Sequence, residues 1–318
     1  MTPVFPDASE RRRGDAPATR IESVPDMQVS QTPSRANRAG WLYVSPLVGV
    51  LVPFFVAPIL VVLAASFFAT DGFGGLTPGF TLSNYIEVLH SALTLKLYLA
   101  TIKFTVLTWI FTLIIGFFVA YFLVFHVRNQ LLAIGLFLLC TVPFWTSNII
   151  RMISWIPLLG KEGLINQALL ATGAIHQPLE VLLFSDLAVV IAYVHQLTIF
   201  MIVPIFNAMA RIDKKLIEAA IDAGASRLDI MRLIVVPMSK SGIALGTIFV
   251  VSIVMGDFFV VKVMSGGQSA SVASALSNEI SQIQYPPAAA NAMILVVIVT
   301  LMVSGILRLV DIRKELTV

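Results

Sequence analysis

The feature that most constrains this chain is a series of six apolar stretches, each long enough to cross a bilayer. A transmembrane helix needs about 20 mainly apolar residues to span about 30 Å of hydrocarbon. Hydrophobic residues make up 58% of the 318 positions and charged residues only 12%, too few to cover a water-soluble fold. We therefore expect an all-α integral membrane protein with six transmembrane helices. The stretches cover residues 42–68, 97–125, 131–153, 185–206, 242–264 and 288–309.

The distribution of basic residues predicts the orientation of these spans. Fifteen Lys and Arg residues lie before residue 41, in the 126–130 turn, in the 208–240 loop and after residue 310, whereas the opposite loops hold two, Lys96 and Lys161. Basic residues accumulate on the cytoplasmic side, so both termini and the 208–240 loop are expected there. The opposite loops carry acidic residues that would attract a cationic solute or a basic partner, unless they are simply tolerated in water. These are Asp71, Glu87, Glu162, Glu180 and Glu279, with Asp186 at a span edge.

The chain divides into a tail and one membrane domain. Residues 1–40 are rich in Pro, Ser, Arg and Asp and lack apolar periodicity, which predicts a disordered cytoplasmic tail. Residues 41–315 then form one six-span domain. The first apolar stretch is too long for the core of a signal peptide, so we expect it to be retained as a span.

The sequence holds no recognisable catalytic or cofactor motif. It has no G-x-x-x-x-G-K-[ST] phosphate-binding loop, its four histidines show no metal-ligand spacing, and its single cysteine, Cys140, lies in an apolar run. No serine, histidine and aspartate occur in a known nucleophile context. The net charge of +3 reflects the ends of spans rather than nucleic-acid binding. We expect a non-enzyme with no metal or cofactor of its own.

The 208–240 loop carries the most local structural information. Asp213 can cap a helix that ends at Gly224, where glycine suits a left-handed turn. Ser226, followed by Asp229 three residues later, can begin a second helix, which should stop or kink near Pro237. The apolar positions of the first helix share one face: Leu216, Ile217, Ala220 and Ile221.

Such a hairpin fits two different surroundings. Ala219 and Ala220 keep it slim and Glu218 adds a fixed charge, which suits docking into a groove on a partner protein. Its Lys and Arg residues also suit a helix pair lying on lipid headgroups. The residues alone leave both interpretations open.

The same loop resembles the E-A-A-x-x-x-G-x(9)-I-x-L-P motif of bacterial ABC-importer permeases. The motif residues are matched by Glu218, Ala219, Ala220, Gly224, Ile234 and Pro237, with Val236 in place of the usual leucine. The resemblance implies a type I ABC-importer permease fold in which this hairpin couples to a separate dimer of ATP-binding subunits. ATP and magnesium would then be bound by that partner.

Three further segments are similar to permeases of the spermidine/putrescine type. They are residues 80–85, residues 143–147 with the positions up to Asn166, and Gly256-Asp257-Phe258 with Gly266-Gly267. This resemblance implies a second permease subunit, either a homologue or a copy of this chain, a periplasmic solute-binding protein and a place in the bacterial inner membrane. The expected solute is small and cationic, polyamine-like, although that branch also handles other small solutes.

Four polar or aromatic residues in or near the spans are candidates for the solute pathway. A charge at mid-bilayer costs about 2.5–3.5 kcal/mol, so Asp257 in the fifth stretch needs a partner or a wet cavity. It is either a pathway residue or a buried structural carboxylate. Arg151 is a pathway, structural or snorkelling residue. Trp145 fits an aromatic belt better than a cation–π cage, and Ser147 either lines the pathway or forms an interhelical hydrogen bond.

We therefore expect the permease subunit of an ATP-driven importer that works by alternating access. A bulky residue at Gly224 should abolish uptake without preventing membrane insertion. The alternatives are a motor-independent secondary transporter or channel, for which the loop would tolerate replacement, and a membrane scaffold without transport.

Overall fold

The structure is a computed structural model that describes residues 45–70, 76–77 and 79–310. The expected disordered tail at 1–40 and the outer-loop residue Asp71 lie outside the described residues. The chain forms two compact units, Met1–Phe55 and Val56–Val318. In the first unit, the described residues 45–55 are helical. The helix bundle belongs to the second unit.

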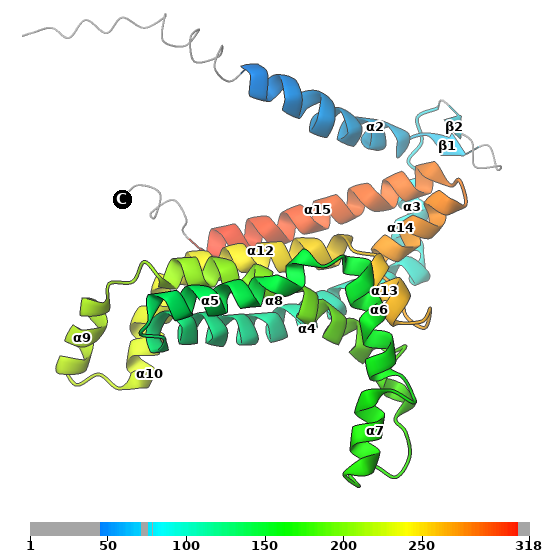
Figure 1. The fold of residues 1–318 in the computed structure, drawn as a ribbon. Helices are drawn as coiled ribbons and strands as arrows, with labels where there is room; N and C mark the ends of the chain where they lie inside the picture. Colours follow the sequence, from blue (N-terminus) through cyan, green and yellow to red (C-terminus); the bar gives the residue numbers. More distant parts are fainter. Residues whose placement is uncertain (1–44, 71–75, 78, 311–318) are drawn as a thin grey trace, which may run out of the picture. The chain divides into compact units, whose positions relative to one another are not determined.

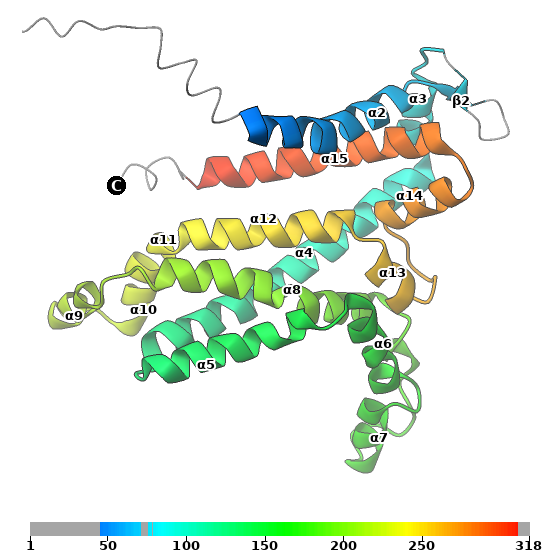
Figure 2. The ribbon, with the colours of Figure 1, turned by 45° about the horizontal axis from the view of Figure 1, so that its top comes forward.

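Three long helices form the centre of the fold. They are α4 (Ala92–Tyr121), α8 (Asp186–Met209) and α12 (Lys240–Gly256), and each packs against the other two (Figure 2). Their facing sides bury large side chains completely, including Phe104 of α4 and Tyr193 and Leu197 of α8. The outward sides remain apolar, as expected of helices surrounded by lipid.

Glycines allow these helices to approach closely. A Cβ atom on Gly242 of α12 would lie 2.4 Å from the carbonyl oxygen of Pro204 in α8, and one on Gly246 would lie 2.6 Å from the Sδ atom of Met201. On the α4 side, a Cβ atom on Gly116 would lie 2.8 Å from the Cγ atom of the same methionine. Small residues at four-residue spacing are typical of helix contacts in membranes, where close backbone packing replaces the hydrophobic effect.

The last helix, α15 (Tyr285–Leu309), packs on α12 and on shorter elements at one end of the bundle. These are α2 (Ala57–Ala65), α3 (Ser83–His90) and α14 (Val272–Ser281). The buried Asn84 joins α3 to the end of α2, because its Nδ2 atom donates to the carbonyl oxygens of Ser66 (3.0 Å) and Phe68 (2.9 Å). A two-residue antiparallel pair, β1 (Ala69–Thr70) and β2 (Leu76–Thr77), is the only sheet in the described part of the chain.

The third expected span, 131–153, is not one continuous helix. After η2 (Phe122–His126), α5 (Gln130–Thr141) continues as a 3-10 turn, η3 (Val142–Trp145), and the chain then bends by 91° into α6 (Asn148–Leu159) and α7 (Leu164–Ala171). Thr146 and Ser147 have extended backbone, with ψ angles of 150° and 137°, so the helical hydrogen bonds are interrupted there. Pro143 has no N–H group for a helical hydrogen bond, and the Thr146 hydroxyl donates to the carbonyl oxygen of Pro143 at 2.9 Å, so both residues favour a break.

The fifth expected span, 242–264, is also interrupted. Helix α12 ends at Gly256, Asp257 is extended, and a short helix, α13 (Phe259–Met264), follows. Among the described residues, four helices are long and apolar enough to cross a membrane, and the number reaches six if each of two bent helix pairs counts as one span.

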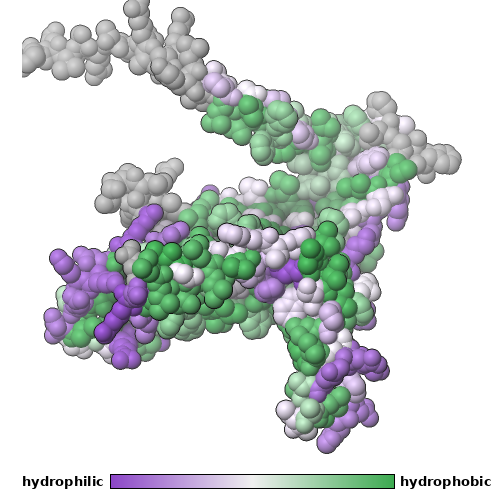
Figure 3. Space-filling view, viewed as in Figure 1, coloured by the Kyte–Doolittle hydropathy of each residue, from purple (hydrophilic) through white to green (hydrophobic). Residues whose placement is uncertain are grey.

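The polar residues concentrate at the two ends of the second unit (Figures 1 and 3). One end carries α9 and α10, the connection between α4 and α5, and the end of α15; the other carries α3, α6, α7, α13 and α14. Apolar residues cover the helices between these ends, as a membrane-embedded bundle requires (Figure 3).

Candidate functional site: the hairpin between α8 and α12

The segment after α8 folds into the hairpin that its local signals predict. Helix α9 (Lys214–Asp222) begins after Asp213, whose Oδ1 atom accepts from the backbone nitrogen of Lys215 at 2.9 Å. Helix α10 (Arg227–Ile230) begins with a capping box. The backbone nitrogen of Asp229 donates to Ser226 Oγ at 3.2 Å, and the backbone nitrogen of Ser226 donates to Asp229 Oδ2 at 3.1 Å. Both predicted helix starts are confirmed.

Gly224 makes the turn between the two helices. Its φ angle is +82°, in the left-handed region that glycine adopts without strain. The backbone nitrogen of Gly224 donates to the carbonyl oxygen of Ile221, and the backbone nitrogen of Ala225 donates to the carbonyl oxygen of Ala220, both at 2.9 Å. This pair of bonds is the Schellman motif. No atom lies within 4 Å of a Cβ built at this position, so backbone conformation rather than space selects glycine.

The predicted kink near Pro237 is present. The chain forms a π turn, η5 (Met231–Val235), and then α11 (Val236–Met238), and the axis bends by 64° before α12 begins. Proline has no N–H group to donate to the carbonyl of Leu233, which accounts for the irregular turn. The buried Ser239 stabilises the bend, because its Oγ atom donates to the carbonyl oxygen of Val235 at 2.6 Å.

One face of the hairpin is fixed to the helix core. Ile230 and Val235 are buried, with 8% and 0% exposure, and belong to the central apolar cluster. Ile217 and Ala220 of α9 and Ile234 of η5 are partly buried against the same cluster. The single apolar face expected for the first helix is therefore divided, since only its inner half packs on the protein.

The outer face of the hairpin is exposed. Glu218, Ala219 and Gly224 are exposed. Four large apolar side chains also face outward, with exposed fractions of 44% for Leu216, 56% for Ile221, 53% for Leu228 and 74% for Leu233. Exposed apolar side chains of this kind within a charged segment mark interaction sites. We call this surface the outer hairpin face; its charged residues are Lys214, Lys215, Glu218, Asp222, Arg227 and Arg232.

Arg151 lies beside a small cavity near the first helix break. Its side chain is only 8% exposed; Nη2 donates to the carbonyl oxygen of Thr146 at 2.9 Å, and Nε has no partner among the described residues. It lines a cavity of about 310 Å³ together with Trp155 and His195. The indole nitrogen of Trp155 lies 3.2 Å from His195 Nδ1. No sequence signal pointed to His195, which is a lone histidine in an apolar run.

The other three pathway candidates do not line this cavity. Trp145 is 81% exposed and lines a separate cavity of about 340 Å³, and Ser147 is exposed directly before α6. Asp257 lies just before α13, and its Oδ1 atom accepts from the backbone nitrogen of Val260 at 2.9 Å and from the hydroxyl of Tyr193 at 3.4 Å. The structure thus distributes the four candidates over the two helix breaks instead of gathering them in one pocket.

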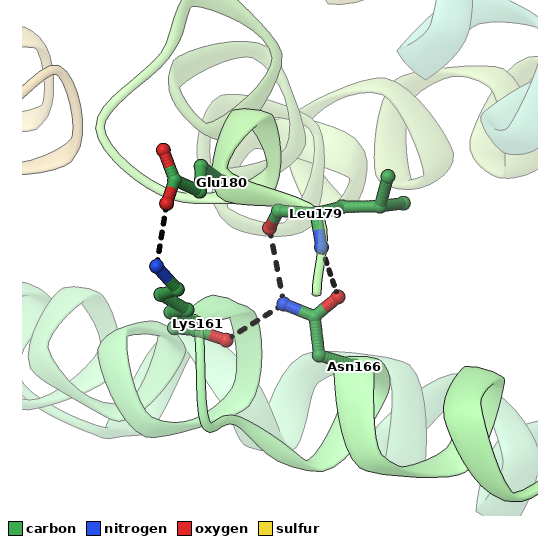
Figure 4. A network of polar contacts seen from close by, with 5 residues as sticks. Lys161, Asn166, Leu179 and Glu180 are labelled. Atoms are coloured by element: carbon green, nitrogen blue, oxygen red, sulfur yellow. Dashed lines mark hydrogen bonds and ion pairs between the residues drawn. The ribbon is translucent and has the colours of Figure 1, made fainter. Parts of the chain in front are cut away.

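The loop after α6 is held by Asn166 (Figure 4). This side chain is fully buried; its Nδ2 atom donates to the carbonyl oxygens of Gly160 (3.1 Å) and Leu179 (3.0 Å), and its Oδ1 atom accepts from the nitrogen of Leu179 (2.8 Å). An exposed ion pair joins Lys161 to Glu180 at 2.6 Å, and the hydrogen bond from Lys161 lowers the pKa of the Glu180 carboxyl. Asn166 therefore holds this loop in place. The sequence identifies Asn166 only as a position shared with related permeases and predicts no structural role for it.

A bundle of this form with a hairpin of this kind has the fold of an ABC-importer permease. The chain superposes with a TM-score of 0.67 on a chain of a bacterial ABC transporter involved in the import of the acidic polysaccharide alginate, covering 86% of this chain and 96% of that one at 15% identity. A second structure of such a transporter, in complex with an alginate-pentasaccharide-bound periplasmic protein, gives the same score. At these identities the likeness concerns the fold.

The sequence comparisons define the family. Residues 112–315 match the binding-protein-dependent transport system inner membrane component family, and the chain belongs to it. The chain is 32% identical to the spermidine/putrescine transport system permease protein PotB of Escherichia coli K12, over 80% of this chain and 92% of PotB. It is 30% identical to PotB of Haemophilus influenzae, over 72% of this chain and 79% of that protein. It is 27% identical to the inner membrane ABC transporter permease protein YdcU of E. coli K12, over 89% of this chain and 97% of YdcU.

These relatives confirm the resemblance seen in the motifs. The chain is an ABC-importer permease of the polyamine branch and a multi-pass protein of the inner membrane. Its relatives are transport subunits and not enzymes.

Proposed function

We propose that this chain forms half of the membrane pathway of an ATP-driven importer for a small cationic solute of the polyamine type. A periplasmic binding protein delivers the solute, a second, homologous permease completes the pathway, and a dimer of ATP-binding subunits holds ATP and magnesium. The PotB relatives, whose names include spermidine and putrescine, support the solute class.

The observation that carries the proposal is the two-sided construction of the hairpin. Its inner face packs on the core formed with α4, α8 and α12, while the outer hairpin face has no partner in the described part of the chain. A body fixed on one side and open on the other transmits movement from a docked partner to the spans. ATP then biases an equilibrium between inward-open and outward-open states through that contact.

Each motif residue has a distinct part in this coupling. Glu218 and Ala219 are exposed and contact the ATP-binding subunit, and Gly224 sets the turn that presents them. Ala220 and Ile234 hold α9 and η5 to the core, and Pro237 sets the bend into α12.

We place the hairpin end of the bundle in the cytoplasm, and we propose that both termini are cytoplasmic as well. The hairpin end is the richer in basic residues, which favours a cytoplasmic position. Its described basic residues are Arg128, Arg211, Lys214, Lys215, Arg227, Arg232, Lys240 and Arg308. At the opposite end, Lys103 and Lys161 are each paired with an acidic residue. The other described Lys and Arg residues there are Lys96, Arg151 and Lys262.

The solute pathway passes the two helix breaks. Trp145, Ser147 and Arg151 lie at or just after the first break and Asp257 lies at the second. Irregular backbone at membrane depth is tolerated where it lines a cavity or is buried in protein, so such breaks are natural places for solute contacts.

The test is uptake into proteoliposomes that contain this chain, the second permease and the ATP-binding subunits, with the binding protein outside. ATP inside the vesicles should drive uptake of labelled 1,4-diaminobutane, and a non-hydrolysable ATP analogue should not. Uptake that needs no ATP but stops when ionophores collapse the ion gradients would instead identify a secondary transporter. ATP-independent, gradient-independent flux would identify a channel.

A further inference from the structure

A cavity lined by both apolar and polar side chains lies at the end of the bundle opposite the hairpin. It has a volume of about 300 Å³ and is formed by the beginning of α4, by α14 and by the beginning of α15. Leu93, Leu97 and Ala275 supply apolar lining. The residues with polar side chains are Thr94, Asn278, Glu279, Gln282 and Asn291.

Glu279 places a negative charge in this cavity without a counter-charge. Its carboxylate accepts from Asn291, whose Nδ2 atom donates to both oxygens at 3.0 and 3.2 Å. No Lys, Arg or His among the described residues forms an ion pair with it. Burial raises the pKa of the Glu279 carboxyl, the hydrogen bond from Asn291 opposes this rise, and the negative charge of Glu87 adds to it. A cation beside a half-buried carboxylate favours its charged form.

Asn291 adds an unused acceptor to the wall of the same cavity. The residue is 4% exposed, and its Oδ1 atom is buried without a hydrogen-bond donor in the described part of the chain. Its Nδ2 atom is occupied by Glu279, so the amide cannot be turned over without losing that bond. Buried polar atoms are normally paired, and an unpaired one suggests a missing donor.

We infer that this cavity binds the primary ammonium group of the transported solute at its entrance to the membrane. An ammonium group has three N–H donors, and the cavity offers the Glu279 carboxylate and the hydroxyl of Thr94 as acceptors, with Asn291 Oδ1 buried in its wall beside them. Leu93 and Leu97 can then contact the methylene chain that follows. A single carboxylate is fewer charged ligands than metal-ion sites usually employ, which favours an organic cation.

This inference deepens the proposed function and rests on it for the orientation of the chain. The cavity lies at the end assigned to the periplasm, where a binding protein would release the solute. It makes Glu279 a specificity-determining residue for amines, separate from the residues at the helix breaks.

The test is binding of labelled 1,4-diaminobutane to the purified full-length chain in lipid nanodiscs. Loss of a hydrogen bond to a charged group weakens binding by about tenfold or more, so we expect that loss in Glu279→Gln. Glu279→Asp keeps the charge and should bind with intermediate affinity. Glu162→Gln, which removes an exposed carboxylate outside the cavity, should bind like the wild type. 1-Aminobutane should compete, and 1-butanol should not.

Equal binding by the wild type and both Glu279 variants would overturn the inference, as would the absence of diamine binding by the wild type. Uptake by the assembled transporter separates this failure from failure of the proposed function. ATP-driven uptake with an unchanged KM in Glu279→Gln would refute the entrance site while the importer stands. Absence of ATP-driven uptake in the wild type would refute the importer itself.

Discussion

The left-handed turn at Gly224 allows a quantitative test of the hairpin. An L-residue in this conformation costs about 1–2 kcal/mol, least for Asn and most for a β-branched residue. Because no atom lies within 4 Å of the position that a Cβ atom would take, this backbone cost is the whole expected effect of a small side chain. The equilibrium between the folded and the locally opened hairpin should therefore shift by a factor of about 5–30 in Gly224→Ala.

Two measurements on the same variants connect this opening to function. Hydrogen exchange of the α9 amides reports the opening equilibrium, and ATP-driven uptake reports coupling. We expect exchange to rise in the order Gly224→Asn, Gly224→Ala, Gly224→Val, and uptake to fall in the same order. Membrane insertion should be unchanged throughout the series.

Gly173 provides a matched control at the other end of the bundle. Its φ angle is +69°, and no atom lies within 4 Å of the position that a Cβ atom would take. The Schellman motif is also present after α7, because the backbone nitrogen of Gly173 donates to the carbonyl oxygen of Leu170 and that of Ala174 donates to the carbonyl oxygen of Leu169. Gly173→Val should open the end of α7 as much as Gly224→Val opens α9, yet leave uptake near the wild-type rate. Full uptake by Gly224→Val, or equal loss in both variants, would refute the reasoning.

Three further predictions concern packing, the outer loop and pH. Gly242→Ala puts a Cβ atom 2.4 Å from a backbone oxygen of α8 and should destabilise the bundle by about 1–3 kcal/mol in thermal unfolding, whereas Gly256→Ala, with open space, should not. Asn166→Ala removes the partner of three backbone groups, the carbonyl oxygens of Gly160 and Leu179 and the nitrogen of Leu179. Each of these groups that stays buried should lower the free energy of unfolding by about 1–3 kcal/mol, so the loop after α6 should become sensitive to limited proteolysis. Hydrogen bonds from Ser226 hold the pKa of Asp229 below its usual value of about 3.9. The hydrogen bonds between the Asp229 carboxylate and Ser226 therefore stabilise α10 above about pH 3.9, and this stabilisation is lost as the pH falls through the lowered pKa. Amide exchange in α10 should rise below about pH 4 in the wild type and not in Asp229→Asn.

Each of these predictions has a contradicting result. Equal melting temperatures for the two glycine variants would mean that α8 and α12 are further apart than the structure places them. Unchanged proteolysis of Asn166→Ala would mean that the loop is held by other contacts. The same pH dependence in Asp229→Asn as in the wild type would assign the titration to another group.

The hairpin was predictable because its signals are local. Asp213, Gly224, Ser226 and Pro237 each act on backbone within a few residues, and the structure uses each of them as expected. The division of α9 into an inner and an outer face was not predictable, because both halves are equally apolar in sequence. Only the position of the core decides which half is covered.

The helix breaks were missed because hydropathy does not report backbone conformation. The third and fifth apolar stretches resume their apolar character within a few residues of Trp145 and Gly256, although the chain bends or stops there. The available signals were Thr146 and Ser147 after Pro143, and Asp257 after Gly256, since short hydroxyl and carboxylate side chains bond to nearby backbone groups and compete with a helix. The pairing of Glu279 with Asn291 joins two helices and required the tertiary structure.

Coupling to ATP requires contact between the outer hairpin face and an ATP-binding subunit. The direct measurement uses the assembled transporter with Cys140 replaced by serine and a photoreactive label attached through Ala219→Cys, with Gly173→Cys as the control position. We predict that the label on α9 crosslinks to the ATP-binding subunit and that the label after α7 does not. Crosslinks from α9 only to lipid or to other parts of the permease would contradict the coupling role of this hairpin.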